Sequence, residues 1–143
     1  YSVPGPHPPR RGWGWGGHSL DGAETALEAA RQLAAITGAV VAITGAVDYV
    51  TDGRRVAAIE NGHPLMTRVT GLGCSATAVI GAFLAVEPDP FAATAAGLAG
   101  FGVAGESAAE RAAGPGSLQV ALLDALYALD EATLQATLRA TVR

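Results

Sequence analysis

Apolar residues recur at helical spacing near the start of the chain, between residues 19 and 38. They lie three or four positions apart: Leu27, Ala30, Ala34 and, slightly off this line, Leu33. Asp21 and Glu24 have the spacing of a capping box, and Gly38 follows where helices commonly end. This pattern predicts one amphipathic helix that begins near Ser19 and ends at Gly38.

The pattern then changes to short apolar runs that predict strands. Residues 39–44 form a continuous apolar run, which is typical of a strand buried on both faces. A helix followed by such a strand indicates half of a βαβ unit and a parallel sheet. Residues 47–51 and 54–59 flank Asp52-Gly53, a strong signal for a two-residue hairpin turn. Because this hairpin is more polar than the preceding strand, we expect it to lie nearer the edge of the sheet.

Two glycines mark the stretch that we call the glycine corner, residues 68–76. Residues 65–69 have an extended pattern, and Gly71 and Gly73 lie one residue apart. A helix predicted over residues 74–86 follows, and the only cysteine of the chain is its first residue. A helix start offers free backbone N–H groups to an anion, and it favours the thiolate form of a cysteine there. The alternative is a plain strand–turn–helix corner with a buried, inert cysteine.

The second half of the chain is predicted to be helical. Asp89, followed by proline, predicts the start of a long helix over residues 90–112. Its interior glycines are Gly97, Gly100, Gly102 and Gly105. Each costs up to about 1 kcal/mol relative to alanine, so we expect other backbones or a ligand to lie close to them. Ser117 is expected to be the N-cap of the next helix, and Asp130 that of a last helix through Leu138. The stripe of the helix after Ser117 consists of Leu118, Ala121, Leu122, Ala125 and Leu129.

The order of elements predicts an α/β fold that is incomplete by itself. It contains too few strands to cover so many apolar helices, so a further N-terminal half or a partner chain is expected. Residues 1–18, which are rich in proline, glycine and tryptophan, are predicted to be a disordered leader. Residues 19–143 are predicted to form the folded part.

Composition narrows the function classes. The chain has 143 residues, a net charge of −4 and only nine lysines and arginines, which argues against a nucleic-acid surface. A single cysteine excludes an intramolecular disulfide and fits a reducing compartment such as the cytoplasm. The apolar runs 69–86 and 91–104 are rich in alanine and glycine, so we expect buried helices rather than membrane spans.

Three interpretations of the glycine corner stay open on local sequence. In phosphoryl transfer, the backbone N–H groups of Gly71, Leu72, Gly73 and Cys74 would form an anion cradle, and the Cys74 thiolate would be the base. In nucleophilic catalysis by the cysteine, His63 would be the base. In the third, the corner has no chemistry. It is not a Walker A loop, because the lysine and spacing of that motif are absent.

Several segments resemble hydroxyethylthiazole kinases. Residues 44–53, TGAVDYVTDG, resemble the family segment V-T-G-E-V-D-Y-V-T-D-G, and residues 61–74, NGHPLMTRVTGLGC, resemble N-G-H-P-L-L-T-K-V-T-G-T-G-C. Three further segments are similar to the family's G-E, G-P-G-S and L-L-D-A-L-Y: residues 105–106, 114–117 and 122–127. The resemblance extends in order from about Ser19 to Leu129.

This resemblance implies the C-terminal portion of a ribokinase-like three-layer sandwich. It implies transfer of the ATP γ-phosphoryl group, with magnesium, to the primary alcohol of 4-methyl-5-(2-hydroxyethyl)thiazole, in thiamine biosynthesis or salvage. By the family pattern Thr44 contacts ATP, Gly71 contacts the thiazole, and Cys74 lies where related sugar and vitamin kinases carry an aspartate base. It further implies a homotrimer with active sites between subunits.

The chain departs from the family pattern at two positions and in length. Leu72 replaces a usual threonine, which removes a hydroxyl from the cradle but keeps the N–H, and Ala46 replaces a usual glutamate. Family members carry a further N-terminal half, which residues 1–18 do not resemble and from which we expect the magnesium ligands. The alternative function is therefore a non-catalytic fragment, or one part of a split kinase that needs a partner chain.

Overall fold

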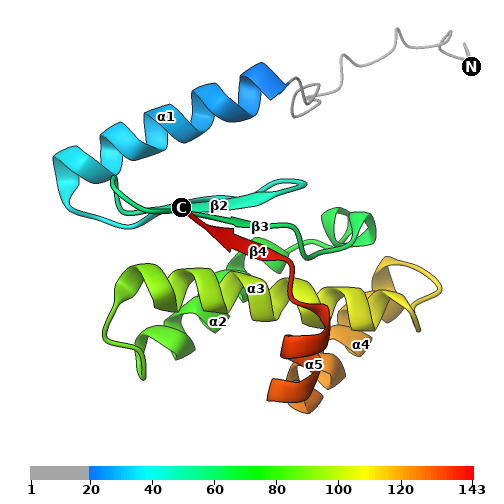
Figure 1. Cartoon of the computed structure of the whole chain (residues 1–143). Coiled ribbons are helices and arrows are strands. Elements are labelled where there is room, and N and C mark those ends of the chain that lie inside the picture. Colours follow the sequence, from blue (N-terminus) through cyan, green and yellow to red (C-terminus); the bar gives the residue numbers. More distant parts are fainter. Residues whose placement is uncertain (1–19) are drawn as a thin grey trace, which may run out of the picture.

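Four short strands form one sheet in the order β1-β2-β3-β4. The computed structural model describes residues 20–143, so the predicted leader lies outside the described residues. The strands are β1 (Val41–Ile43), β2 (Asp48–Thr51), β3 (Val56–Ile59) and β4 (Ala140–Val142). The helices are α1 (Leu20–Thr37), the 3-10 helix η1 (Pro64–Arg68), α2 (Leu72–Leu84), α3 (Pro90–Ala109), α4 (Pro115–Ala128) and α5 (Glu131–Thr137). Helix α1 lies on one face of the sheet and α3 on the other, which gives three layers (Figure 1).

The α/β class is confirmed, but the predicted parallel sheet is wrong for the described strands. All three strand pairs are antiparallel. The connections from β1 to β2 and from β2 to β3 are too short for the crossover that a parallel pair needs. The expected positions are also reversed, since β1 lies at an edge and β2 and β3 lie in the centre. Ala42 in β1 is exposed, whereas Val50 and Val56 of the central hairpin are buried.

The hairpin between β2 and β3 turns over four residues, 52–55, rather than over the two-residue turn predicted at Asp52-Gly53. Gly53 adopts a φ of 91°, a left-handed conformation that favours glycine. The Asp52 carboxylate accepts hydrogen bonds from the N–H groups of Arg54 and Arg55, at 2.9 and 2.7 Å. A side chain therefore takes over part of the hydrogen bonding that a tight turn would make across the strands.

Helix α1 confirms the predicted apolar stripe but not the predicted capping box. Leu27, Ala30 and Ala34 are buried, while Leu33 is 51% exposed. The helix begins at Leu20, so Asp21 lies in the first turn rather than at the N-cap of the predicted capping box.

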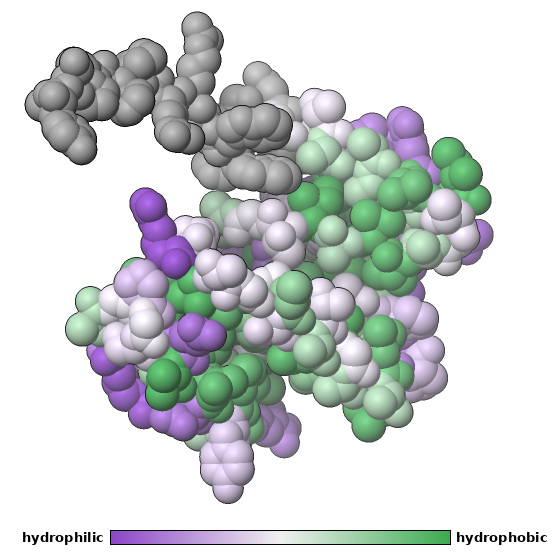
Figure 2. Space-filling model, turned by 180° about the vertical axis from the view of Figure 1, so that it is seen from behind, coloured by the Kyte–Doolittle hydropathy of each residue, from purple (hydrophilic) through white to green (hydrophobic). Residues whose placement is uncertain are grey.

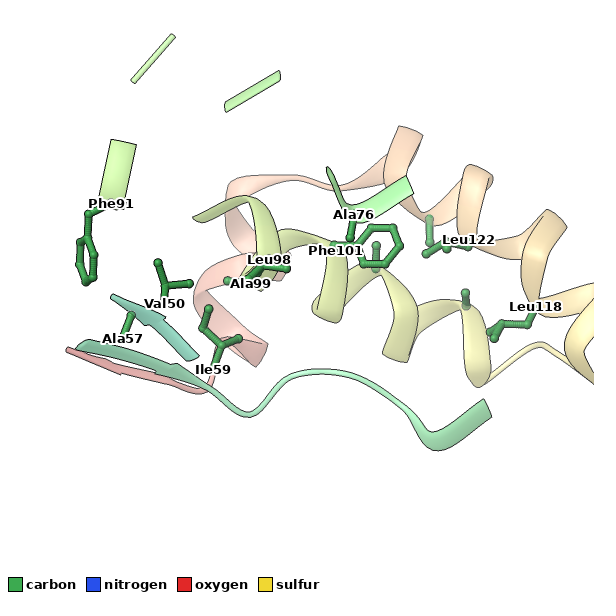
Figure 3. Close-up of a cluster of buried hydrophobic side chains, with 13 residues drawn as sticks. Val50, Ala57, Ile59, Ala76, Phe91, Leu98, Ala99, Phe101, Leu118 and Leu122 are labelled. Atoms are coloured by element: carbon green, nitrogen blue, oxygen red, sulfur yellow. The ribbon is translucent and has the colours of Figure 1, made fainter. Parts of the chain in front are cut away.

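Helix α3 lies at the centre of the hydrophobic core (Figure 3). Core side chains from the sheet, α2, α3 and α4 include Val50, Ala57, Ile59, Ala76, Phe91, Leu98, Ala99, Phe101, Leu118 and Leu122. The expectation that neighbours lie close to its glycines is confirmed. A Cβ atom on Gly97 would lie 2.9 Å from the Cα of Ile80 in α2, and one on Gly105 would overlap the Sδ of Met66. Glycine thus lets α3 approach two other elements at van der Waals distance.

The helix starts at Asp89 and Asp130 are confirmed, because each carboxylate caps its helix by accepting a backbone N–H. The N-cap predicted at Ser117 is wrong. Helix α4 begins earlier, with Gly114 as N-cap, and the Ser117 hydroxyl accepts a hydrogen bond from the Gly114 N–H at 3.1 Å. The predicted helix through Leu138 ends at Thr137. The chain then forms β4, which the sequence pattern did not predict.

Helix α2 is largely uncovered, which contradicts the expectation of a fully buried helix over residues 69–86. Ala76 is its only buried residue, whereas the run 91–104 lies mostly in the core. Figure 2 shows several apolar areas on one face of the molecule. The exposed large apolar side chains among the described residues are Leu33, Ile36, Leu84, Val86, Val120, Leu123, Tyr127, Leu138 and Val142. Within residues 20–143, no helix has the length and apolar character needed to cross a membrane.

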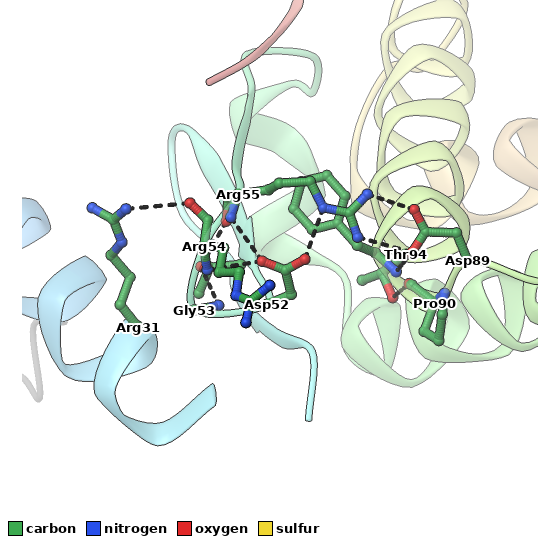
Figure 4. A network of polar contacts seen from close by, with 10 residues as sticks. Arg31, Asp52, Gly53, Arg54, Arg55, Asp89, Pro90 and Thr94 are labelled. Carbon is green, nitrogen blue, oxygen red and sulfur yellow. Dashed lines mark hydrogen bonds and ion pairs between the residues drawn. The ribbon is translucent and has the colours of Figure 1, made fainter. Parts of the chain in front are cut away.

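Arg55 joins the hairpin loop to the start of α3 (Figure 4). Its guanidinium donates to both carboxylate oxygens of Asp89, at 2.6 and 3.0 Å, and to Asp52 at 2.7 Å. It also lies over the Phe91 ring, 4.2 Å from the centroid. Hydrogen bonds from the Arg55 backbone and side chain lower the pKa of Asp52 to about 2. The Arg55 side chain also lowers the pKa of Asp89 below its ordinary value.

This network predicts a loss of stability in acid. Because folding lowers both carboxyl pKa values, the stabilisation is present above the ordinary value of 3.8 and is lost as pH falls toward about 2. Arg55→Met should reduce the loss of unfolding free energy between pH 5 and pH 2.5. A residual loss should persist, because the backbone N–H bonds to Asp52 stay in place. Urea unfolding followed by circular dichroism at several pH values measures this dependence.

Arg54→Met provides a matched control for the charge change. The Arg54 side chain is exposed and forms no ion pair within residues 20–143. This variant should keep the wild-type slope between pH 5 and pH 2.5. Equal slopes for wild type and Arg55→Met would show that the network does not contribute to acid stability.

Candidate functional site

The glycine corner is built by a 3-10 helix, a left-handed glycine and the start of α2. Residues 64–68 form η1 instead of the predicted extended run, because Pro64 fixes a helical first residue and His63 caps it. The His63 Nδ1 accepts a hydrogen bond from the Leu65 N–H at 3.2 Å. The chain is again extended at Val69 and then reverses at Gly71, whose φ is 88°. Gly71 is the N-cap of α2.

The first turn of α2 presents free backbone donors. The N-cap Gly71 has no side chain to accept them, and the hydrogen bond from the Ser75 N–H to the Gly71 carbonyl, at 3.0 Å, begins the helical pattern. The N–H groups of Leu72, Gly73 and Cys74 therefore lie before the first helical hydrogen bond and point out of the helix end. A Cβ atom on Gly71 or on Gly73 would meet no heavy atom within 4 Å. The predicted anion cradle thus faces open space.

Cys74 lies in the first turn of α2 and is exposed as a free thiol. The burial expected for Cys74 under the alternative without chemistry is therefore wrong. The structure gives no support to a cysteine–histidine pair, because no hydrogen bond joins Cys74 and His63 among the described residues and His63 is engaged as a cap. Donors for an anion and an accessible thiol come together at one point, an arrangement that suits proton removal beside a phosphoryl group.

Thr44 lies at the same end of the sheet as the segment that leads into the corner. It follows β1 directly and is exposed. Strands β1 and β3 both pair antiparallel with β2, so they run in the same direction, and residues 60–61 follow β3 at the end of the sheet where Thr44 follows β1. The structure therefore brings these two chain segments to the same end of the sheet, with β2 between β1 and β3. No hydrogen bond or ion pair within residues 20–143 joins Thr44 to the corner.

A partly buried carboxylate at the start of β2, that of Asp48, contacts the loop after Thr44. The Asp48 side chain accepts a hydrogen bond from the Gly45 N–H at 2.8 Å. Burial raises the pKa of Asp48, and this hydrogen bond offsets part of the rise. Asp48 therefore holds the loop beside Thr44 in a fixed turn.

A polar cluster at the same end of the sheet was not predicted as part of the site. Asn61 is 5% exposed, and its side chain bonds Glu106 in α3, the Thr137 carbonyl and the Arg139 N–H. Burial raises the pKa of Glu106, but hydrogen bonds from Arg139, Gly62 and Asn61 outweigh it and leave the pKa below its ordinary value. Asn61 and Glu106 lie in motifs of the family resemblance, but only the contacts show that they meet.

The described residues do not by themselves form a metal site. No group of three or more histidine, cysteine, aspartate or glutamate side chains in residues 20–143 could hold a metal ion. Two shallow hollows lie along α1 and between α1 and the hairpin loop, and neither includes a residue of the glycine corner.

The three-layer α/β arrangement and the free N–H groups at the start of α2 define an α/β protein with backbone donors exposed at one end of a helix. Comparison with known proteins narrows this class. The model of the hydroxyethylthiazole kinase family matches residues 12–132, and the chain belongs to this family. The match begins at residue 12, inside the segment predicted as a leader.

Individual relatives agree with the family match. A hydroxyethylthiazole kinase from Granulibacter bethesdensis is 66% identical over 124 residues, which cover 87% of this chain and 45% of the relative. One from Zea mays is 50% identical over 119 residues, covering 82% of this chain and 42% of the relative. The structure of a hydroxyethylthiazole kinase from Pyrococcus horikoshii matches with a TM-score of 0.82 and 44% identity, covering 86% of this chain and 48% of that chain. The chain thus spans about half the length of the relatives it matches.

Proposed function

We propose that the chain contributes the phosphoryl-transfer corner of a cytoplasmic kinase that phosphorylates the primary alcohol of 4-methyl-5-(2-hydroxyethyl)thiazole, with ATP as donor. The observation that carries the proposal is the coincidence of free N–H groups and an exposed thiol at the start of α2. A kinase needs electrostatic stabilisation of the moving phosphoryl group and a base near the acceptor hydroxyl. Membership of the hydroxyethylthiazole kinase family supports the choice of the thiazole alcohol, and we propose that the reaction belongs to thiamine biosynthesis or salvage.

The proposed residue roles combine the positions of the side chains and amides with the family pattern for Thr44 and Gly71. The N–H groups of Leu72, Gly73 and Cys74 stabilise negative charge on the phosphoryl group, and Gly71 keeps the space for the thiazole alcohol open. The Cys74 thiolate accepts the hydroxyl proton. Thr44, at the exposed end of β1, contacts ATP. Leu72 lacks the hydroxyl of the usual threonine, but its backbone N–H still belongs to the cradle.

Magnesium and the subunit arrangement belong to the same proposal. Magnesium in kinase sites is held by few carboxylates together with the substrate phosphates, so it would arrive with ATP. The described residues lack a carboxylate cluster for it, and no step here depends on the ion. We propose that the whole kinase is a homotrimer, in which subunits cover apolar surface that this chain leaves exposed.

The test measures ADP formation by the purified chain with ATP, magnesium and the thiazole alcohol. The reaction is run with the chain alone and with the remaining part of the Granulibacter bethesdensis relative added, and the intact relative serves as positive control. Turnover that depends on the alcohol, in either mixture, supports the kinase. Absence of turnover in both mixtures, with an active control, overturns it.

A second function, that of a non-catalytic fragment or one part of a split kinase, is favoured by the exposed apolar surface. Nine large apolar side chains among the described residues are exposed, Val86 to 82% and Tyr127 to 95%, and a partner chain would cover such side chains where they adjoin. Turnover only in the mixture with the added part identifies a split kinase. Binding of the two parts without turnover identifies a non-catalytic partner.

A further inference from the structure

We propose that Glu106 is a positioning residue for the glycine corner, and that the C-terminal segment acts on the corner through it. The proposal rests on the proposed function for the role of the corner. It concerns how the corner is held in place, and its test needs no turnover.

The Glu106 carboxylate is shared between the turn after β3 and the segment before β4. One oxygen accepts hydrogen bonds from the Gly62 N–H, at 2.8 Å, and from the Arg139 guanidinium. The other accepts from the Asn61 side chain at 3.1 Å. The Glu106 side chain is only 23% exposed. Hydrogen bonds to a charged group with limited access to water are among the stronger ones in proteins, so this carboxylate fixes the turn firmly.

The turn continues directly into the corner. Gly62 is followed by η1, whose Met66 lies against Gly105, the residue before Glu106 in α3. Val69 and Leu72 then pack against the hydrophobic core. Helix α3 therefore holds this segment at its entrance by hydrogen bonds and at its middle by contact. A shift of the turn at residues 61–62 would therefore change the orientation of η1 and, with it, the position of the glycine corner.

Arg139 connects this arrangement to the end of the chain. Its backbone N–H donates to the Asn61 side chain at 2.7 Å, and its guanidinium donates to the Glu60 carbonyl at 3.1 Å. Strand β4, which follows Arg139, pairs with β3. Both lie beyond residue 132, where the family match ends. A segment outside the matched region thus supports a turn that lies inside it.

The test uses the lone thiol of the full chain as a reporter. Iodoacetamide alkylates the Cys74 sulfur, so the alkylation rate depends on whether the N–H groups at the start of α2 face this sulfur. Cys74 is already exposed, so a looser corner makes the thiol little more accessible to the reagent. The main effect of a looser corner is that the N–H groups no longer point toward the sulfur. Glu106→Ala should slow alkylation about fivefold under native conditions, and Arg139→Ala should slow it less. Glu106→Gln, which keeps an acceptor for the Gly62 N–H, should restore part of the rate.

Arg55→Ala is the matched control, because it removes a surface ion pair from the opposite end of α3. It should destabilise the chain and leave the alkylation rate at the wild-type value. Equal rates for wild type and Glu106→Ala, or equal slowing by Arg55→Ala, overturn the proposal. If Glu106→Ala does not fold, Arg139→Ala decides the question, and a wild-type rate then overturns it. The alkylation rates do not depend on kinase activity. A chain without turnover would therefore contradict the proposed function but not this proposal.

Discussion

Gly102→Ala is expected to lower the free energy of unfolding by about 3 kcal/mol, the upper part of the range for overpacked cores. A Cβ atom at this position in α3 would lie 2.6 Å from the carbonyl oxygen of Asn61 and 2.8 Å from its carbonyl carbon. Contacts this short require the backbone of one element to move. The gain of up to about 1 kcal/mol from replacing a helical glycine cannot compensate.

Asn61 has little freedom to move away from Gly102. Its side chain donates to the Thr137 carbonyl at 2.9 Å and accepts from the Arg139 N–H at 2.7 Å. A displacement of Asn61 would therefore strain the connection between β3 and the C-terminal segment as well. Urea unfolding followed by circular dichroism measures the loss of stability.

Gly81→Ala is the matched control for this substitution. Gly81 also lies inside a helix, α2, but a Cβ atom there would meet no heavy atom within 4 Å. This variant should be more stable than wild type by up to about 1 kcal/mol. Wild-type stability of Gly102→Ala would show that the close approach of α3 to Asn61 has no energetic consequence.

Features set by neighbours in the sequence could be predicted. Asp89 and Asp130 cap helices because a short carboxylate side chain reaches the N–H groups two or three residues ahead. The glycine corner could be predicted for the same reason, since the left-handed turn at Gly71 is a local property. The close contacts of the α3 glycines followed from the energetic cost of glycine in a helix.

Features set by distant residues could not be predicted from local patterns. The apolar run of β1 indicates a buried strand, but the burial of a strand depends on which strands lie beside it. Strand β4 has three residues and depends on its pairing with β3, far earlier in the chain. The shared hydrogen bonds of Glu106 join α3 to two separate segments. Each of these facts needed the three-dimensional structure, because a single sequence does not show long-range contacts.

Cys74→Ala is expected to lower the kcat of thiazole phosphorylation by about 10² to 10⁴, the typical contribution of a general base. The assay uses whichever mixture turns over, the chain alone or the chain with the remaining part of its relative. The kcat should fall because alanine removes the group that accepts the hydroxyl proton, while the N–H cradle stays in place. Cys74→Asp should keep more activity than Cys74→Ala, because a carboxylate can accept the proton from the same helix position.

Two further variants separate the base from other roles of this residue. Cys74→Ser keeps the size of the side chain but supplies no anion at neutral pH, so its kcat should resemble that of Cys74→Ala. The activity of Cys74→Asp should extend to lower pH than that of wild type, since an aspartate ionises at an ordinary pKa of about 3.9. Equal loss in Cys74→Asp and Cys74→Ala, with no difference in pH dependence, would exclude the base role. A cysteine nucleophile would instead make His63→Ala as damaging as Cys74→Ala, whereas a kinase in which His63 only caps η1 should keep most of its kcat in His63→Ala.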